Sequence, residues 1–187
     1  MKLVENNFLI YKLLNSSFTG LSIGILFTIY EPLDPEIYSV GGMVLACAML
    51  IIAKFYHRLL NIKSFYWITL FVEMIMLLTI VVFFAIQYSF TSALVIYCGY
   101  QLTFIFGGYL FRAETLVANR KELLSKIDVN KQVGYLVGLG ASFVFYKTLD
   151  LGLEITDPKE QIAILHYFLI LLQSIILILV LKSFRLE

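Results

Sequence analysis

Charged residues are scarce in this sequence. Asp, Glu, Lys and Arg make up 14% of the 187 residues, against roughly 25% in a typical soluble domain. Hydrophobic residues make up 60%, which is more than a soluble fold of this size can bury, because much of a short chain stays at its surface. This composition predicts a protein that lies in a lipid bilayer. The net charge of +1 argues against nucleic acid as a partner, since binding it requires a basic face.

Cysteine and histidine are rare as well, with two residues of each. Cys47 and Cys98 lie far apart in apolar stretches without C-x-x-C spacing, so neither redox chemistry nor a zinc site is indicated. An H-E-x-x-H metalloprotease motif is absent, and two histidines are too few for most intramembrane haem sites. We therefore expect no enzymatic activity, no metal and no other cofactor.

Six stretches of the sequence are long and apolar enough to cross a bilayer, which takes about 20 residues of helix. The fifth stretch is the shortest and the least apolar. We expect an all-α membrane protein in which residues 1–187 form one six-helix domain. The predicted spans are about 8–30, 38–56, 64–87, 91–112, 132–149 and 161–183.

The charges of the connections predict the orientation. With the N-terminus in the cytoplasm, 12 of the 14 Lys and Arg fall on the cytoplasmic side, and only Lys147 and Lys159 fall outside. Positive charge is retained in the cytoplasm during insertion, so we expect both termini there, in a bacterial-type cytoplasmic (inner) membrane. Segment 113–130 is expected to be amphipathic and cytoplasmic, as a surface helix or an extension of the fourth span; a basic loop is the alternative.

Polar side chains inside the predicted spans each need a partner or a role, because an unpaired polar group in hydrocarbon costs free energy. Glu73 lies about nine residues into the third span, or ~14 Å at ~1.5 Å per residue. Gln101 and Gln173 lie at a similar depth, and His166 lies nearer the outer surface. We interpret the ionisable Glu73 and His166 as a proton or cation relay or as substrate contacts; hydrogen bonds that only fix helix packing are the alternative.

The first and fourth spans are the best candidates to line a pathway. Polar residues of the first span recur at i, i+4 and i+7, which places them on one helical face, and polar residues also cluster in the fourth. These candidate cavity residues are Asn15, Thr19, Ser22, Tyr97, Tyr100 and Gln101.

A weak internal repeat relates the same two spans. Four residues of the first match four of the fourth at identical spacing, and the two spans run in opposite directions, as in a 3+3 inverted repeat. Gly134 and Gly138 of the fifth span form a G-x-x-x-G pattern, which predicts close helix packing. The matched residues are Thr19, Gly24, Leu26 and Phe27 with Thr103, Gly108, Leu110 and Phe111.

The connection between the second and third spans keeps Arg58 and a trailing Lys63 of a G-x-x-x-D-R-x-G-R-R-like signature, with Ala53, His57 and Leu60 at its other positions. With this signature and six spans, the chain resembles one half of a major facilitator superfamily transporter. The resemblance implies a parallel homodimer that moves a small molecule or ion by alternating access, with Arg58 and Lys63 in a conformational loop.

Another class of protein fits the same size and number of spans. A membrane-embedded subunit of a larger complex, such as the six-helix substrate-binding component of an energy-coupling-factor transporter, is the alternative to a transporter half. A purely structural subunit is a further possibility. In every case the bilayer is the main partner, and the sequence does not identify the solute.

Overall fold

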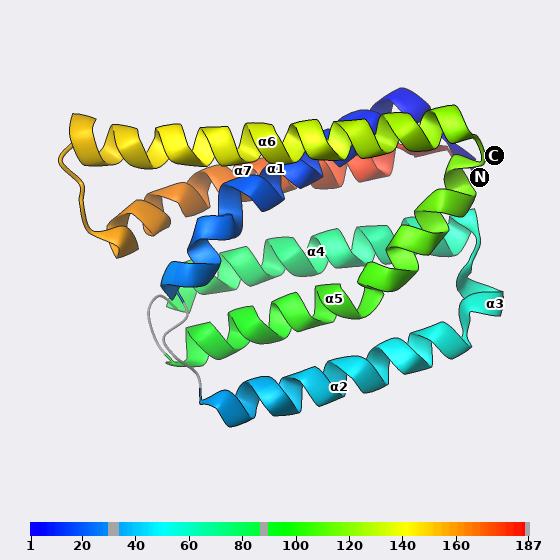
Figure 1. The fold of residues 1–187 in the computed structure, drawn as a ribbon, viewed down its shortest axis with the longest axis horizontal. Coiled ribbons are helices and arrows are strands. Elements are labelled where there is room, and N and C mark those ends of the chain that lie inside the picture. The colour runs from blue at the N-terminus through cyan, green and yellow to red at the C-terminus, as the bar shows by residue number, and fades with distance from the viewer. Residues whose placement is uncertain (30–33, 87–89, 186–187) are drawn as a thin grey trace.

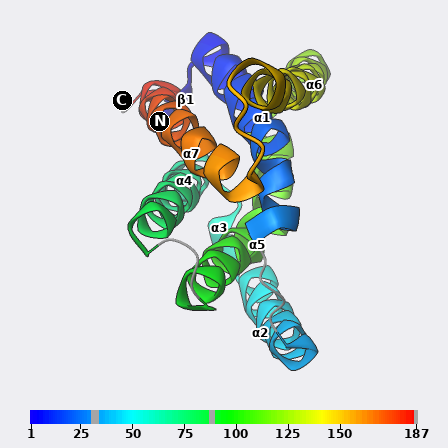
Figure 2. The ribbon, with the colours of Figure 1, turned by 90° about the vertical axis from the view of Figure 1, so that its left-hand side faces the viewer.

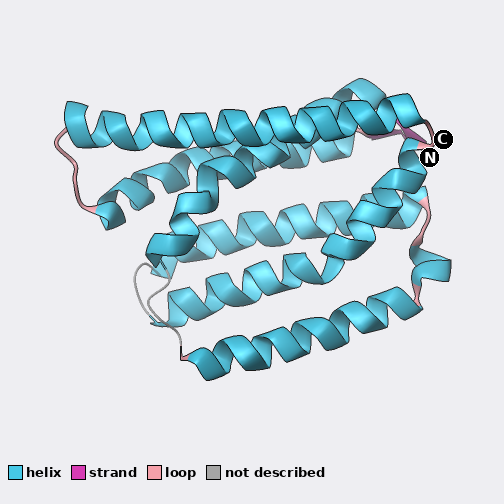
Figure 3. Ribbon diagram, in the orientation of Figure 1, coloured by secondary structure: helices cyan, strands magenta, loops and turns pink. Residues whose placement is uncertain are grey.

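The computed structural model describes residues 1–29, 34–86 and 90–185, and this part of the chain is helical almost throughout (Figures 1 and 3). Proline opens two of the helices, where its missing N–H and fixed φ are tolerated. The elements are β1 (Lys2–Leu3), α1 (Glu5–Ile29), α2 (Pro35–Lys54), α3 (Tyr56–Leu59), α4 (Ile62–Ile86), α5 (Phe90–Ala118), α6 (Lys121–Gly152), α7 (Pro158–Lys182) and β2 (Phe184–Arg185).

Among the described residues, five helices are long and apolar enough to cross a membrane: α1, α2, α4, α5 and α7. The expected all-helical architecture is therefore confirmed, and it fits a multi-pass membrane protein. Helix α6 contains the fifth predicted span, residues 132–149, and is 32 residues long, but it is not among the five. Positions 30 and 87, the predicted ends of the first and third spans, lie outside the described residues.

Segment 113–130 does not form a separate helix. Residues 113–118 continue α5, and residues 121–130 are the beginning of α6. Only Asn119 and Arg120 lie between the two helices, and Asn119 has a φ of 50°, the left-handed conformation that commonly ends a helix. The two helices are therefore joined by a tight turn.

Both chain ends lie at one end of the bundle, because the six long helices run in alternating directions (Figure 1). We call this the terminal end. There β1 and β2 pair as an antiparallel ladder, with Lys2 opposite Arg185 and Leu3 opposite Phe184. The 12 Lys and Arg expected in the cytoplasm all lie on the half of the bundle nearer the terminal end, whereas Lys147 and Lys159 lie on the other half.

The helices are not packed equally tightly. Helix α1 packs along α6 and α7, α4 packs on α7 and α5, and α2 packs mainly on α5. Figure 2 shows α2 at the edge of the bundle, beyond α5. None of its residues is buried, and Met43 and Val44 are 62% and 61% exposed. An apolar face of this size requires an apolar environment or a partner.

The closest helix pair, α1 and α6, depends on glycine. A Cβ added to Gly134 would lie 2.1 Å from the carbonyl oxygen of Leu13, and one added to Gly138 would lie 2.2 Å from that of Ser17. A Cβ on Gly20 of α1 would similarly lie 2.4 Å from the carbonyl oxygen of Tyr135. Since no real side chain fits at these distances, the G-x-x-x-G pattern lies where two backbones touch.

We predict that Gly138→Ala destabilises the protein by about 1–3 kcal/mol, because the added methyl group must push α1 and α6 apart. Gly140→Ala is the matched control, since a Cβ at Gly140 meets no atom within 4 Å. Thermal melting of the detergent-solubilised protein measures both. Equal melting temperatures for the two variants would show that the backbone contact is absent.

Candidate functional site

Glu73 of α4 is buried at the junction of three helices, with 4% of its surface exposed. Its Oε1 accepts hydrogen bonds from the Tyr11 hydroxyl and the Asn15 side-chain amide of α1, both at 2.8 Å. The Gln173 side-chain amide of α7 donates to Oε2 at 2.7 Å and to the Glu73 backbone oxygen at 3.0 Å. Three uncharged donors therefore surround a carboxylate that only accepts.

A cavity of about 300 Å³ lies beside Glu73, between α1, α4 and α5. We call it the central cavity. Its apolar walls include Phe18, Met76 and Phe104. A concave apolar site with a few convergent polar groups is typical of a small-molecule binding site. Five of the candidate residues from the sequence line it: Asn15, Thr19, Ser22, Glu73 and Tyr100.

The other candidates from the fourth span face elsewhere. Tyr97 turns toward α2, where its hydroxyl donates to the Tyr38 backbone oxygen at 3.4 Å and the two rings meet edge to face. Gln101 is half-buried and does not line the central cavity, and its Oε1 has no hydrogen-bond partner among the described residues.

His166 of α7 is buried, but it lies apart from the central cavity. Its Nδ1 donates to the Ile162 carbonyl oxygen in the same helix at 2.7 Å, and its ring stacks on Phe83 at a centroid distance of 4.4 Å. With Ser22 and Tyr100, it lines a separate hollow of about 20 Å³. This hollow holds at most a water molecule.

Arg58 and Lys63 are both exposed at the terminal end, in α3 and in the first turn of α4. They are remote from the central cavity. No geometry in the described chain assigns them a role, so their part in a conformational loop stays an expectation.

The structure adds charged residues that the sequence did not single out. Glu114 of α5 is 3% exposed and pairs with Lys12 of α1 through Oε2 and with Lys131 of α6 through Oε1. Lys12 is 8% exposed and lines the central cavity. The sequence could have predicted the position of Lys12, since it lies three residues before Asn15 and therefore on the same face of α1.

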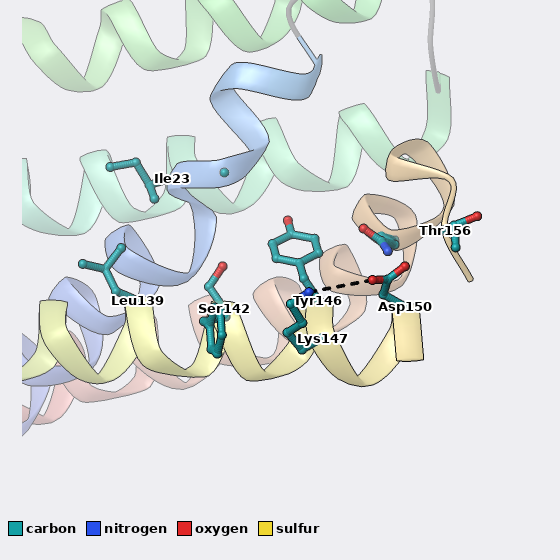
Figure 4. A pocket seen from close by; sticks show the side chains of 10 residues that line it. Ile23, Leu139, Ser142, Tyr146, Lys147, Asp150 and Thr156 are labelled. Atoms are coloured by element: carbon teal, nitrogen blue, oxygen red, sulfur yellow. Dashed lines mark ion pairs between the residues drawn. The ribbon is translucent and has the colours of Figure 1, made fainter. Parts of the chain in front are cut away.

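A second, more open pocket of about 540 Å³ lies between α1, α6 and the beginning of α7 (Figure 4). Ser142 and Tyr146 point from α6 toward α1, and Lys147 pairs with Asp150 at 3.9 Å beside them. This ion pair is half-exposed, and surface pairs of this kind contribute little to stability. The central cavity, with its buried charges, is the better candidate site.

Residues Gly20 to Gly24 of α1 read G-x-S-x-G. In hydrolases this pattern presents its serine on a sharp turn between a strand and a helix. Here Ser22 lies within the continuous helix α1, and its hydroxyl donates to the Thr19 carbonyl oxygen at 3.4 Å. The geometry of a nucleophile elbow is therefore missing.

No family model, curated protein or solved structure matches this chain. The fold and the site themselves define the class: a helical protein with several helices able to cross a membrane and a polar cavity between them.

We predict that Gln173→Leu lowers stability by about 1–3 kcal/mol, because it removes a donor from the buried Glu73 carboxylate and from its backbone oxygen. Combined with Glu73→Gln, the loss should be smaller than the sum of the two single losses, as expected for groups in contact. Thermal melting of the four proteins of this cycle measures the coupling. Ser174→Ala is the control, since that hydroxyl donates only within its own helix. Additive losses would show that Gln173 does not support Glu73.

Proposed function

We propose that this protein spans a bacterial-type cytoplasmic membrane six times, with both termini in the cytoplasm, and carries a small solute through its central cavity by alternating access. The observation that carries this proposal is the cavity itself. Polar and ionisable groups inside a membrane-embedded bundle are costly and usually mark a substrate or ion pathway. Here Lys12, Glu73 and the polar face of α1 meet at one such space.

Support for a sixth span comes from how α6 packs. Residues 132–146 carry no charge and cover about 22 Å of helix at ~1.5 Å per residue. Lys147 follows this stretch, and its long side chain can extend to the membrane surface. Backbone contact with α1 along the glycines keeps α6 beside an apolar helix, at the depth of the other spans.

The orientation is supported by the charge distribution. The half of the bundle nearer the terminal end holds 12 of the 14 Lys and Arg, and by the positive-inside rule this distribution favours a cytoplasmic terminal end.

The neighbours of each helix support an inverted repeat. Helix α1 packs on α6 and α7, and α5 packs on α2 and α4. An inverted repeat would relate α1 to α5, α2 to α6 and α4 to α7. Under this exchange the α1–α6 pair corresponds to α5–α2, the α1–α7 pair corresponds to α5–α4, and the α4–α7 pair corresponds to itself. Thr19 and Thr103, which match in the internal repeat, both line the central cavity. This relation is typical of one half of a major facilitator-like transporter.

The mouth of the central cavity supports a homodimer. Thr19 is exposed, and Phe104 is 54% exposed, so the described part of the chain leaves the cavity open. Lipid tails cannot satisfy the polar groups inside it. A second copy in the same orientation would close the space and supply the missing half.

One observation favours the alternative, a substrate-binding subunit of a larger complex. Three helices of a single chain already line the central cavity, so one copy could hold a solute without a second. A partner complex would then supply the movement. Both proposals use the same cavity and differ in what covers it.

We predict that Thr19→Cys reacts with a membrane-impermeant thiol reagent, because that position is exposed at a cavity that the proposed carrier must open to water. Val44→Cys should not react, because α2 faces lipid, although Val44 is 61% exposed. Both are made after replacing Cys47 and Cys98 with serine. The same labelling experiment tests the orientation of α6. Thr148→Cys, on the proposed outer side, should react in intact cells, and Lys126→Cys, on the proposed cytoplasmic side, should react only after permeabilisation. Equal labelling of Thr19→Cys and Val44→Cys, or labelling of both α6 sites from one side, would contradict the proposal.

We also predict that native mass spectrometry from lipid nanodiscs finds two copies of the chain, since the cavity needs a second copy to close. Co-purification of ATPase subunits with a single copy would instead favour the binding-subunit alternative. A lone monomer without partners would contradict both.

A further inference from the structure

Four buried or partly buried charges lie in and beside the central cavity. They are Lys12, Glu73, Glu114 and Lys131, of which the two glutamates are 4% and 3% exposed. Only Lys12 and Glu73 line the cavity itself. The other two lie behind Lys12, toward the beginning of α6. We call these four residues the charge cluster.

Lys12 is the member of the charge cluster that can change partner. Glu114 uses a different oxygen for each lysine, so it remains paired with Lys131 when Lys12 leaves. The Lys12 ammonium also lies over the rings of Phe8 and Tyr11, at 5.2 and 5.1 Å from their centroids, which stabilises its charge without an anionic partner. Lys12 can therefore receive an anionic group from the cavity in exchange for Glu114.

Glu73 provides the opposite charge on the same cavity. Its three hydrogen-bond donors, Tyr11, Asn15 and Gln173, are all uncharged, and the cation that acts on it is Lys12 on the same cavity wall. An ionised carboxylate offers about four acceptor positions, which leaves one beyond these three. A cationic group in the cavity would find that position and the negative charge together.

The buried and partly buried charges cancel, two positive against two negative; Asp128, which pairs with Lys131 at 3.8 Å, is exposed to water. A solute with a net charge would leave one charge uncompensated in a low-dielectric interior, where this is costly. We infer that the central cavity binds a small zwitterion of amino-acid size, with its carboxylate on Lys12 and its ammonium group toward Glu73. This inference rests on the proposed function and names the chemical class of its solute.

The size and walls of the cavity agree with this class. Its volume of about 300 Å³ lies at the lower end of the range for small-molecule sites. Phe18, Met76 and Phe104 provide apolar contacts for the rest of such a solute.

The test compares four probes of nearly equal size: phenylalanine, 3-phenylpropionate, phenethylamine and 3-phenylpropanamide. They carry both charges, only the negative charge, only the positive charge, and neither. Equilibrium binding of radiolabelled probes is measured with the full chain in lipid nanodiscs. Phenylalanine should bind at least about tenfold more tightly than each of the others. A probe with one charge unbalances the charges of the cavity, and the uncharged probe gains no ion pair with Lys12 or Glu73.

Variants of the charge cluster should change this preference in opposite directions. Lys12→Gln should lose binding of phenylalanine. Glu114→Gln frees Lys12 and leaves a net positive cluster, so 3-phenylpropionate should gain about tenfold or more in affinity. Glu73→Gln should make phenylalanine and 3-phenylpropionate bind equally. Misfolding cannot explain a gain of affinity for 3-phenylpropionate in Glu114→Gln. It also cannot explain a loss of the preference for phenylalanine in Glu73→Gln while both probes still bind.

The inference is overturned if any single-charge or uncharged probe matches phenylalanine in the unaltered protein, if none of the four binds, or if Lys12→Gln binds phenylalanine normally. The proposed function is judged separately, by the labelling of Thr19→Cys and the copy number. If Thr19→Cys is labelled and the protein is dimeric but binds none of these probes, the proposed carrier function stands and only the inferred solute class is wrong.

Discussion

An ionisable side chain inside an apolar bundle has to be surrounded by donors or opposite charges, and this requirement connects the helices of the central cavity. Glu73 on α4 takes two of its three donors from α1, and Glu114 on α5 takes one of its two lysines from α1. Both acidic residues therefore depend on the same helix. The close backbone contact with α6 fixes α1 in place, so the cavity, its charges and the packing of the bundle form one system.

Periodicity and depth were enough to predict much of the candidate site. The recurrence of Asn15, Thr19 and Ser22 predicted that they share one face of α1, because a helix repeats every 3.6 residues whatever surrounds it, and that face lines the central cavity. Counting along the third and sixth spans placed Glu73 and Gln173 at one level, and they are hydrogen-bonded. Both arguments need only helix geometry, which the apolar composition already indicated.

The remaining features of the candidate site depend on how the helices are rotated about their axes and on where they end. Local sequence patterns do not determine either. Gln101 follows Tyr100 by one residue, or about 100° around the helix, so only Tyr100 reaches the cavity. Glu114 was assigned to a connection because its span was expected to end at residue 112, whereas α5 continues to Ala118. Lys12 was counted only as a charge that sets the orientation, although its helical face already indicated the cavity.

The ladder between β1 and β2 has a consequence for how such a protein could evolve. Since residues 2 and 185 are neighbours at one end of the bundle, a duplicated gene fused head to tail would need only a linker at that end. Under the proposed six-span topology, no additional crossing would be required, and both copies would keep the same orientation. The fused descendant could then acquire different residues in its two halves, which the identical subunits of the proposed homodimer cannot do.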